Sequence, residues 1–363
     1  MILLNPGPVT LSARVRQALA REDLCHREQE FADLTLDIRA RIERIYPDAQ
    51  PAHAAVLLTG SGSAAVEAML SSLLPADGKT LVVANGVYGE RMATILARHR
   101  RPHHVLRLDW TEAIDCRLVE AALDADPTIA HVASVHHETT TGRLNDIATL
   151  GALCRRRGLG LLLDAVSSFG AEEIRFDEWN LVAAAAAANK CLHGVPGVAF
   201  VLARRDVLAD CSRHADSLYL DLGLLYREQQ AGWSPFTQAV QAFFALHEAL
   251  CEFEEAGGQA ARRARYVQLS SLLRRELPAA GATLLLPPDD YASMLTSFRL
   301  PPGVGYAGLH DELKRRGFTI YAGQGHLAPQ IFRIATMGAL SDPDLERLLD
   351  SCRAVFATRP ATS

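Results

Sequence analysis

LVAAAAAANKCLHGVPG, residues 181–197, is the stretch of this chain that decides its fold. A short run of small apolar residues ends at Asn189-Lys190, and a turn rich in glycine and proline follows at once. Alanine by itself favours a helix, but the run is short and its exit breaks helices, which favours a closely covered buried strand. We therefore expect a strand that delivers Lys190 to one edge of a sheet.

A second apolar run, Leu159–Leu163, ends in the acidic residue Asp164. A lysine after a strand is usually a solvated surface charge, and an aspartate there is usually a helix cap. Together, however, they are the two charges that pyridoxal phosphate (PLP) chemistry needs. The lysine forms a Schiff base with the aldehyde, and the carboxylate keeps the pyridine nitrogen protonated.

Short apolar runs alternate with helical patterns through the first two-thirds of the chain. The strand-like runs are Ala54–Leu58, Leu81–Ala84, His104–Leu108, Ile129–Val135, Leu159–Leu163, Leu181–Ala187 and Val198–Leu202. Helical stretches between them include Ala64–Leu74, Gly89–Arg98 and Ile147–Arg157. Repeated strand–crossover–strand units predict an α/β fold with a mostly parallel seven-stranded sheet covered on both faces.

The last third has a different pattern. A long helical region, Thr237 to about Leu277, is interrupted at Gly257-Gly258. Expected strands then follow at Thr283–Leu286, Leu295–Leu300, Phe318–Tyr321 and Ile331–Ile334, with helices at Tyr306–Arg316 and Asp344–Phe356. We expect a large domain of residues 15–250 and a small α+β domain of residues 251–363, which also takes in residues 1–14.

Composition excludes several classes of protein. The 363 residues are 49% hydrophobic with a formal net charge of −5 and no long basic run, so no nucleic-acid partner is indicated. No apolar run is long enough to cross a membrane, and the N-terminus has no secretion signal. The seven cysteines are scattered without metal-ligand spacing, which suggests reduced thiols in a cytoplasm and no metal site.

Two further segments place small or aromatic residues directly after strands. Gly60-Ser61-Gly62-Ser63 opens a helix, where backbone N–H groups and the helix dipole favour a phosphate, although a tight turn would read the same way. The spacing matches neither the Walker nor the Rossmann motif. Tyr88, flanked by Gly86 and Gly89, can lay its ring over a flat cofactor or be an ordinary buried tyrosine.

The segment His136-His137-Glu138-Thr139 ends another expected strand. It suggests a metal site, but neighbouring residues at a strand end point in opposite directions, which disfavours that reading. A Thr139 hydroxyl that reaches the cofactor ring oxygen or the Asp164 carboxylate is a better interpretation. These segments all fall at the carboxyl ends of strands, where open α/β sheets bind ligands.

The order of these motifs resembles that of the fold-type I, class V PLP-dependent aminotransferases. The motifs are Pro-Gly-Pro near the start, Gly-Ser-Gly-Ser, Asn-Gly-x-Tyr-Gly, Glu-Thr-Thr-Thr-Gly, Asp-Ala-Val-Ser-Ser and Asn-Lys-Cys. Within that class, the chain is most similar to the 2-aminoethylphosphonate–pyruvate transaminase family, from Asn5 to Ala335.

The resemblance implies roles for individual residues. Lys190 would hold the cofactor and move the substrate proton, and Asp164 would pair with the pyridinium nitrogen. The implied cofactor-binding residues are Gly62 and Ser63 at the phosphate, Val166 and Tyr88 on the two ring faces, and Thr139 beside the ring.

Two residues are implied to act from outside this cofactor group. Thr237 resembles the position that reaches the phosphate in the neighbouring subunit, which implies a homodimer with shared active sites. Arg333 matches the small-domain arginine that binds the substrate's anionic group. A planar guanidinium can bind a phosphonate or a carboxylate through two parallel hydrogen bonds, which lysine cannot do.

The chain departs from the family in one loop. Many members carry Tyr-Pro-Gly-Lys before the arginine, and this chain has Tyr321-Ala322-Gly323-Gln324. The missing lysine would weaken a phosphonate site unless His326, His26 or Arg27 supplies a donor.

The resemblance implies a transaminase that interconverts 2-aminoethylphosphonate and pyruvate with phosphonoacetaldehyde and L-alanine. An alanine- or serine–glyoxylate-type class V transaminase is the alternative, as is an enzyme for a related aminophosphonate. Direction of turnover stays open. A desulfurase is disfavoured because Cys191 adjoins the lysine and no mobile-loop cysteine is evident. A non-catalytic ligand sensor with the same fold is a further alternative.

Overall fold

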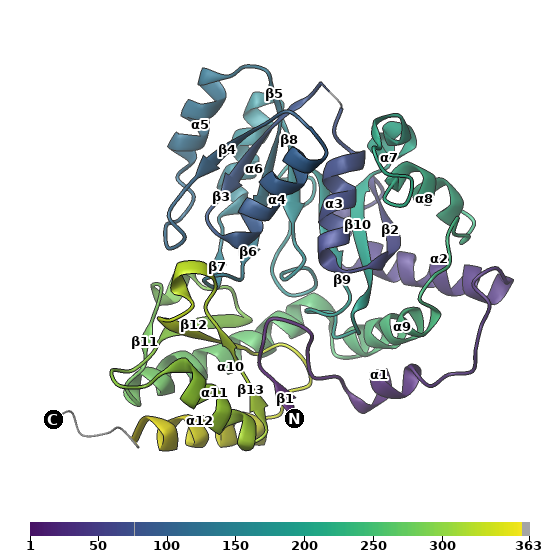
Figure 1. The fold of residues 1–363 in the computed structure, drawn as a ribbon. Coiled ribbons are helices and arrows are strands. Elements are labelled where there is room, and N and C mark those ends of the chain that lie inside the picture. Colours follow the sequence, from purple (N-terminus) through teal and green to yellow (C-terminus); the bar gives the residue numbers. More distant parts are fainter. Residues whose placement is uncertain (76, 358–363) are drawn as a thin grey trace.

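The computed structural model describes residues 1–75 and 77–357 of the chain, and its centre is a seven-stranded sheet (Figure 1). The strand order is β2-β10-β9-β8-β5-β3-β4. In that order the strands are His53–Gly60, Gly197–Arg204, Leu181–Ala187, Gly160–Asp164, Ile129–Val135, Lys79–Ala84 and His103–Arg107. Strand β10 is antiparallel to β2 and β9, and the other four strand pairs are parallel, so the predicted mostly parallel α/β sheet is confirmed.

Helices cover both faces of this sheet (Figure 1). Along β10, Val198, Phe200 and Leu202 belong to one apolar core, and the alternating residues 199, 201 and 203 belong to the other. This is the two-residue period of a strand buried on both sides. The alanines of β9 leave room for helix α3 to pack closely on it.

The helices of this part have the following bounds: α1 Ala13–Ala18, α2 Gln29–Arg44, α3 Gly62–Ser72, α4 Val87–Arg98, α5 Cys116–Ala125, α6 Ile147–Arg157, α7 Arg205–Asp210, α8 Leu222–Gln229 and α9 Val240–Glu255. Helices α3, α4 and α8 contribute to one core, whereas α2, α6 and α9 contribute to the other. A short hairpin, β6 (His137–Glu138) with β7 (Arg143–Leu144), extends beyond β5.

A second, four-stranded antiparallel sheet has the order β11-β12-β15-β14. Its strands are Thr283–Leu284, Leu295–Arg299, Ile331–Ala335 and Tyr321–Ala322, and its helices are α10 (Gly258–Ala279), α11 (Tyr306–Arg315) and α12 (Asp342–Ala357). This unit has a core of its own, which includes Leu4 from the N-terminal segment. It lies at one end of the large sheet (Figure 1).

The prediction of one continuous strand at Phe318–Tyr321 was wrong, because the structure divides this segment into two strands. Residues Phe318–Thr319 (β13) pair in parallel with Ile2–Leu3 (β1), and β14 pairs with β15 instead. The two halves therefore join different sheets. Pairing with β1 also holds the N-terminus against this unit, as Figure 1 shows. Among the described residues, no helix is long and apolar enough to span a bilayer.

Candidate active site

Lys190 lies in a short, tightly closed loop after β9. Gly194 N–H donates to the Ala188 carbonyl at 2.8 Å, and His193 N–H donates to the Lys190 carbonyl at 3.0 Å. The lysine side chain lies against the N-terminal segment, where its Nζ donates to the Pro6 carbonyl. A Cβ on Gly7 would lie 2.6 Å from Nζ, and the φ of +104° also favours glycine there. The Pro-Gly-Pro motif therefore packs directly on Lys190.

The chain has three lysines, and Lys190 differs from the other two. Lys79 pairs with Asp126, and Lys314 lies exposed on α11. Burial lowers the pKa of the Lys190 amine to about 8, with Cys191 and Asp164 opposing the shift. A neutral amine at mildly alkaline pH is the form that can attack an aldehyde or accept a proton.

Asp164 is the last residue of β8 and is only 7% exposed. Strand β8 pairs in parallel with β9, so Asp164 and the Lys190 loop leave the same edge of the sheet. Its Oδ1 accepts from the Val166 N–H at 3.0 Å. Burial raises the pKa of the carboxyl to about 6, against the opposing effects of that hydrogen bond, Arg91 and Lys190. Within the described residues it makes no ion pair, so a cationic ring nitrogen would supply a missing partner.

The first turn of α3 lies beside Val166. A Cβ on Gly62 would come within 2.5 Å of Val166 Cγ1, so only glycine fits at this close approach. The N-cap, Ser61, makes no side-chain cap hydrogen bond. The N–H groups of Gly62 and Ser63 are therefore open at the positive end of the helix dipole, which suits a phosphate.

Tyr88 lies in the first turn of α4, after β3. The guanidinium of Arg91 lies 4.6 Å from the centre of the Tyr88 ring, and its Nη1 donates to Ser63 Oγ at 3.0 Å. Sequence reasoning did not identify Arg91. The signal that could have found it is its spacing of three residues from Tyr88, which puts both side chains on one helix face.

Arg333, on β15, brings the smaller sheet to the site and is 3% exposed. Its Nε donates to the Ala322 carbonyl at 2.9 Å, and its Nη1 donates to the Thr139 carbonyl at 2.6 Å and to Gln324 Oε1 at 3.2 Å. In the described part of the chain its Nη2 makes no hydrogen bond. Burial lowers the pKa of the guanidinium, while Tyr88 and Glu138 oppose that effect.

The structure thus brings most of the expected residues together. These are Lys190, Asp164, Val166, Gly62, Ser63, Tyr88, Thr139 and Arg333. Thr139 contacts Arg333 through its carbonyl, and its hydroxyl makes no hydrogen bond within the described residues. Thr237 is exposed and is not hydrogen-bonded to this group.

None of the three alternative donors, His326, His26 and Arg27, makes a described hydrogen bond with Arg333 or Gln324. The His326 ring lies 4.5 Å from that of Trp110, centre to centre. His26 and Arg27 precede α2, and no described hydrogen bond or ion pair connects them to Arg333.

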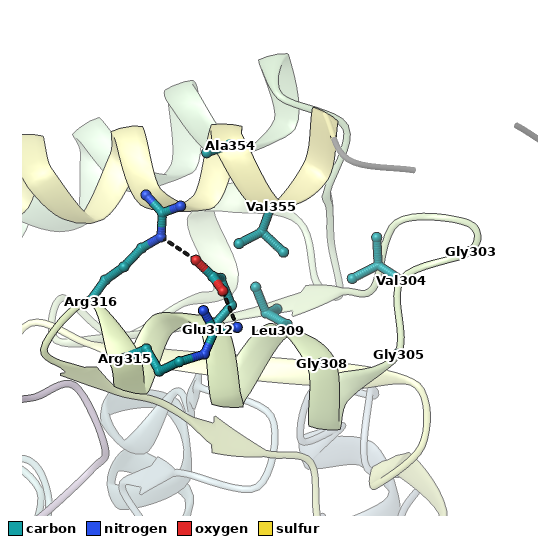
Figure 2. Close-up of a pocket in the computed structure, with 10 residues that line it drawn as sticks. All are labelled: Gly303, Val304, Gly305, Gly308, Leu309, Glu312, Arg315, Arg316, Ala354 and Val355. Atoms are coloured by element: carbon teal, nitrogen blue, oxygen red, sulfur yellow. Dashed lines mark hydrogen bonds and ion pairs between the residues drawn. The ribbon is translucent and has the colours of Figure 1, made fainter. Parts of the chain in front are cut away.

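A cavity of about 410 Å³ lies elsewhere, between α11 and α12 (Figure 2). Its charged residues are Glu312, Arg315 and Arg316, and the glutamate pairs with both arginines. None of the site residues described above lines it. This cavity therefore lacks the groups that the chemistry needs.

The residues of the site fit pyridoxal phosphate. A nucleophilic amine and an unpaired buried carboxylate face one region, and the open N–H groups of α3 lie beside Val166. These are the partners of an aldehyde, a pyridinium nitrogen and a phosphate on a flat ring.

Comparison with known proteins defines the class. Residues 13–358 match the family described as aminotransferase class-V. The chain is 38% identical to the 2-aminoethylphosphonate–pyruvate transaminase of Syntrophobacter fumaroxidans over 97% of this chain and 95% of that protein. It is 37% identical to the Salmonella typhimurium protein of the same name, with 98% and 97% covered.

Solved structures agree in fold. An aspartate aminotransferase of subgroup IV from Thermus thermophilus has a TM-score of 0.88 at 27% identity, covering 98% of this chain and 99% of that one. An alanine–glyoxylate aminotransferase from Nostoc sp. has a TM-score of 0.90 at 25% identity, covering 98% and 94%.

The chain belongs to the class V aminotransferase family. It is a PLP-dependent aminotransferase of fold-type I, and the cofactor expected from the sequence is confirmed.

Proposed function

We propose that this aminotransferase interconverts 2-aminoethylphosphonate and pyruvate with phosphonoacetaldehyde and L-alanine. The observation that carries the proposal is the position of Arg333. Its buried guanidinium is fixed by hydrogen bonds from Nε and Nη1, and its Nη2 is left free to bind an anion at the site that contains Lys190. The relatives named above, which cover nearly the whole chain, support the same substrates.

Lys190 is proposed to attach the cofactor and then to carry the proton between substrate Cα and the cofactor. When bound, the cofactor supplies an electron-accepting ring that makes the Cα proton removable. Asp164 keeps the ring nitrogen protonated, and Val166 and Tyr88 hold the two ring faces. Thr139 lies beside the ring, and Gly62 and Ser63 bind the phosphate.

Arg333 is proposed to bind the anionic group of either substrate, a phosphonate or a carboxylate. Gln324 accepts from Arg333 through Oε1, so its Nε2 can donate to the same anion alongside Nη2. The donor pair carries one formal positive charge, whereas an arginine–lysine pair would carry two. This favours a carboxylate more than a doubly charged phosphonate, which keeps the alanine- or serine–glyoxylate transaminase as the second candidate function.

We further propose a homodimer in which Thr237 reaches the cofactor phosphate of the neighbouring subunit. Its exposure in the single chain is consistent with a partner contact. Tyr219 is 43% exposed and its ring lies 5.0 Å from that of Phe236, while Leu218 is 72% exposed. Apolar exposure next to Thr237 is what a subunit interface requires.

The domain division is also proposed, with residues 15–250 as the large domain and residues 251–363 plus 1–14 as the small one. Helix α9 continues to Glu255, so the natural boundary is the break at Gly257. Residues 358–363 lie outside the described part of the chain. All seven cysteines are free, which supports a reducing compartment such as the cytoplasm.

An amine-donor panel tests the proposal. The loaded enzyme is mixed with 2-aminoethylphosphonate, alanine or serine without an acceptor, and the cofactor's visible absorption is followed. Two half-reactions at one lysine predict ping-pong kinetics, so a change with 2-aminoethylphosphonate should be reversed by pyruvate. No change with that amine, beside a full change with alanine or serine, would overturn the substrate assignment in favour of the second candidate.

A further inference from the structure

Arg91 is a cation of the site with no carboxylate partner. It is half-buried on α4, and its described contacts are the Tyr88 ring at 4.6 Å and Ser63 Oγ at 3.0 Å. It makes no ion pair in the described part of the chain, whereas Arg101 pairs with Asp216 and Arg107 pairs with Glu90. A fixed guanidinium without an anion next to an open helix N-terminus points to an anionic ligand.

The helix that carries Arg91 is held at its start by a neighbouring segment. Val87 N–H donates to Thr140 Oγ1 at 3.1 Å, and that hydroxyl donates to Glu138 Oε1 at 2.6 Å. Glu138 is fully buried, and a Cβ on Gly86 would lie 2.2 Å from its Cδ. Because Gly86 has no side chain to cap α4, Thr140 and Glu138 replace the usual cap. The first turns of α4 are thereby fixed.

The Ser63 contact places the guanidinium beside the start of α3. Ser63 is the second residue of that helix, and the N–H groups of Gly62 and Ser63 have no intrahelical partner. A guanidinium added to such N–H groups gives the donor set that proteins use for phosphate. The charge of Arg91 also acts on the site. It lowers the pKa of Asp164, which burial raises, and it lowers the pKa of Lys190, which burial also lowers.

We propose that Arg91 is an anion-binding residue of the active site that contacts a tetrahedral phosphorus oxyanion. The cofactor phosphate is one source of that group, and it is the source expected closer to Ser63, because it would bind at the start of α3. The phosphonate of the substrate is the other source. Only this second source rests on the proposed function.

The test compares Arg91→Met with Arg98→Met, which removes an exposed arginine from the same helix. The dissociation constants of pyridoxal 5′-phosphate and of pyridoxal, which lacks the phosphate, are measured by absorbance on protein stripped of cofactor. KM values for 2-aminoethylphosphonate and alanine are measured at saturating cofactor. Arg91→Lys keeps the charge without the planar fork, and serves if the methionine variant does not fold.

We expect Arg91→Met to weaken pyridoxal 5′-phosphate binding by about 10- to 100-fold and pyridoxal binding by less than about twofold. The affinity of Arg91→Lys for pyridoxal 5′-phosphate should lie between those of Arg91→Met and the parent, and the affinity of Arg98→Met should equal that of the parent. If cofactor binding is unchanged but KM rises for 2-aminoethylphosphonate and not for alanine, the oxyanion is the substrate's phosphonate.

Two results would overturn the inference. Equal weakening of pyridoxal and its phosphate would mean that Arg91 acts only through the Tyr88 ring. If Arg91→Met matches Arg98→Met in its affinity for pyridoxal and pyridoxal 5′-phosphate and also in its KM for 2-aminoethylphosphonate, Arg91 binds no anion. A parent enzyme that does not react with 2-aminoethylphosphonate would contradict the proposed function but leave the cofactor comparison fully readable.

Discussion

The two halves of the site are built in different ways. The cofactor half, with Lys190, Asp164 and the start of α3, follows buried strands of one sheet whose register fixes each position. The substrate half consists of Arg333 on β15 and Gln324 in the loop before it, joined to the large sheet through the Thr139 carbonyl. The first half is determined by strand ends, whereas the second depends on single side chains that can change the substrate without disturbing the fold.

The largest effect should come from the cofactor half. Lys190→Ala removes both the attachment point and the proton carrier, so we expect the transamination rate to fall by at least about 10⁴-fold. The rate is measured under single-turnover conditions, with Lys314→Ala as the control because that lysine is exposed on α11. A Lys190→Ala enzyme within about tenfold of the parent would contradict the assignment.

Arg333→Ala tests the substrate half. A charge pair at about 4 Å contributes about 4 kcal/mol at an effective dielectric near 20, so kcat/KM should fall by roughly 10³-fold for either anionic substrate. Cofactor affinity should stay near that of the parent. Arg315→Ala, in the cavity of Figure 2, is the matched control. A loss of cofactor affinity as large as the loss of kcat/KM would remove the distinction between the two halves.

Asp164→Asn should stabilise the protein stripped of cofactor in a pH-dependent way. The pKa of Asp164 is raised from 3.8 to about 6 by burial, so the unfolded chain releases its proton first as pH rises. The free energy of unfolding of the parent therefore falls by roughly 3 kcal/mol as the pH rises from about 4 to about 6.

Urea unfolding at several pH values measures this effect. Asp164→Asn lacks the ionisation, so it should be more stable than the parent above about pH 6 and equal to it near pH 4. A difference in the free energy of unfolding between variant and parent that does not change with pH would contradict the burial of an Asp164 carboxylate without an ion-pair partner.

The smallest effect should come from Gln324. Gln324→Lys adds a second cation at the anion site and should raise kcat/KM for 2-aminoethylphosphonate relative to alanine by several-fold to about tenfold. Gln324→Glu should pair with Arg333 and lower kcat/KM for both amines. If Gln324→Lys leaves the ratio of the two kcat/KM values unchanged, Gln324 does not contribute to substrate choice.

Much of the cofactor half was predictable because its signals are local. An apolar run followed by Asp164, or by Asn189-Lys190, places a charge at a strand end regardless of the rest of the chain. All seven runs assigned to the large sheet are strands of it. The helices Ile147–Arg157 and Gly89–Arg98 were likewise found, the second beginning two residues earlier at Val87.

The remainder depends on contacts that sequence patterns do not contain. The Pro6 carbonyl reaches Lys190 from 184 positions away in the chain. The division of Phe318–Tyr321 depends on pairing with the N-terminus, and the contact between Arg91 and Ser63 depends on the packing of α4 beside α3. The roles proposed for Thr237 and Gln324 are predictions of the same kind, since each depends on a group outside the chain.

The most direct test of the central claim is borohydride reduction of the loaded enzyme followed by peptide mapping. The chain has only three lysines, so the result is unambiguous. The account predicts one phosphopyridoxyl adduct, on the peptide that contains Lys190. An adduct on Lys79 or Lys314, or none at all, would contradict it.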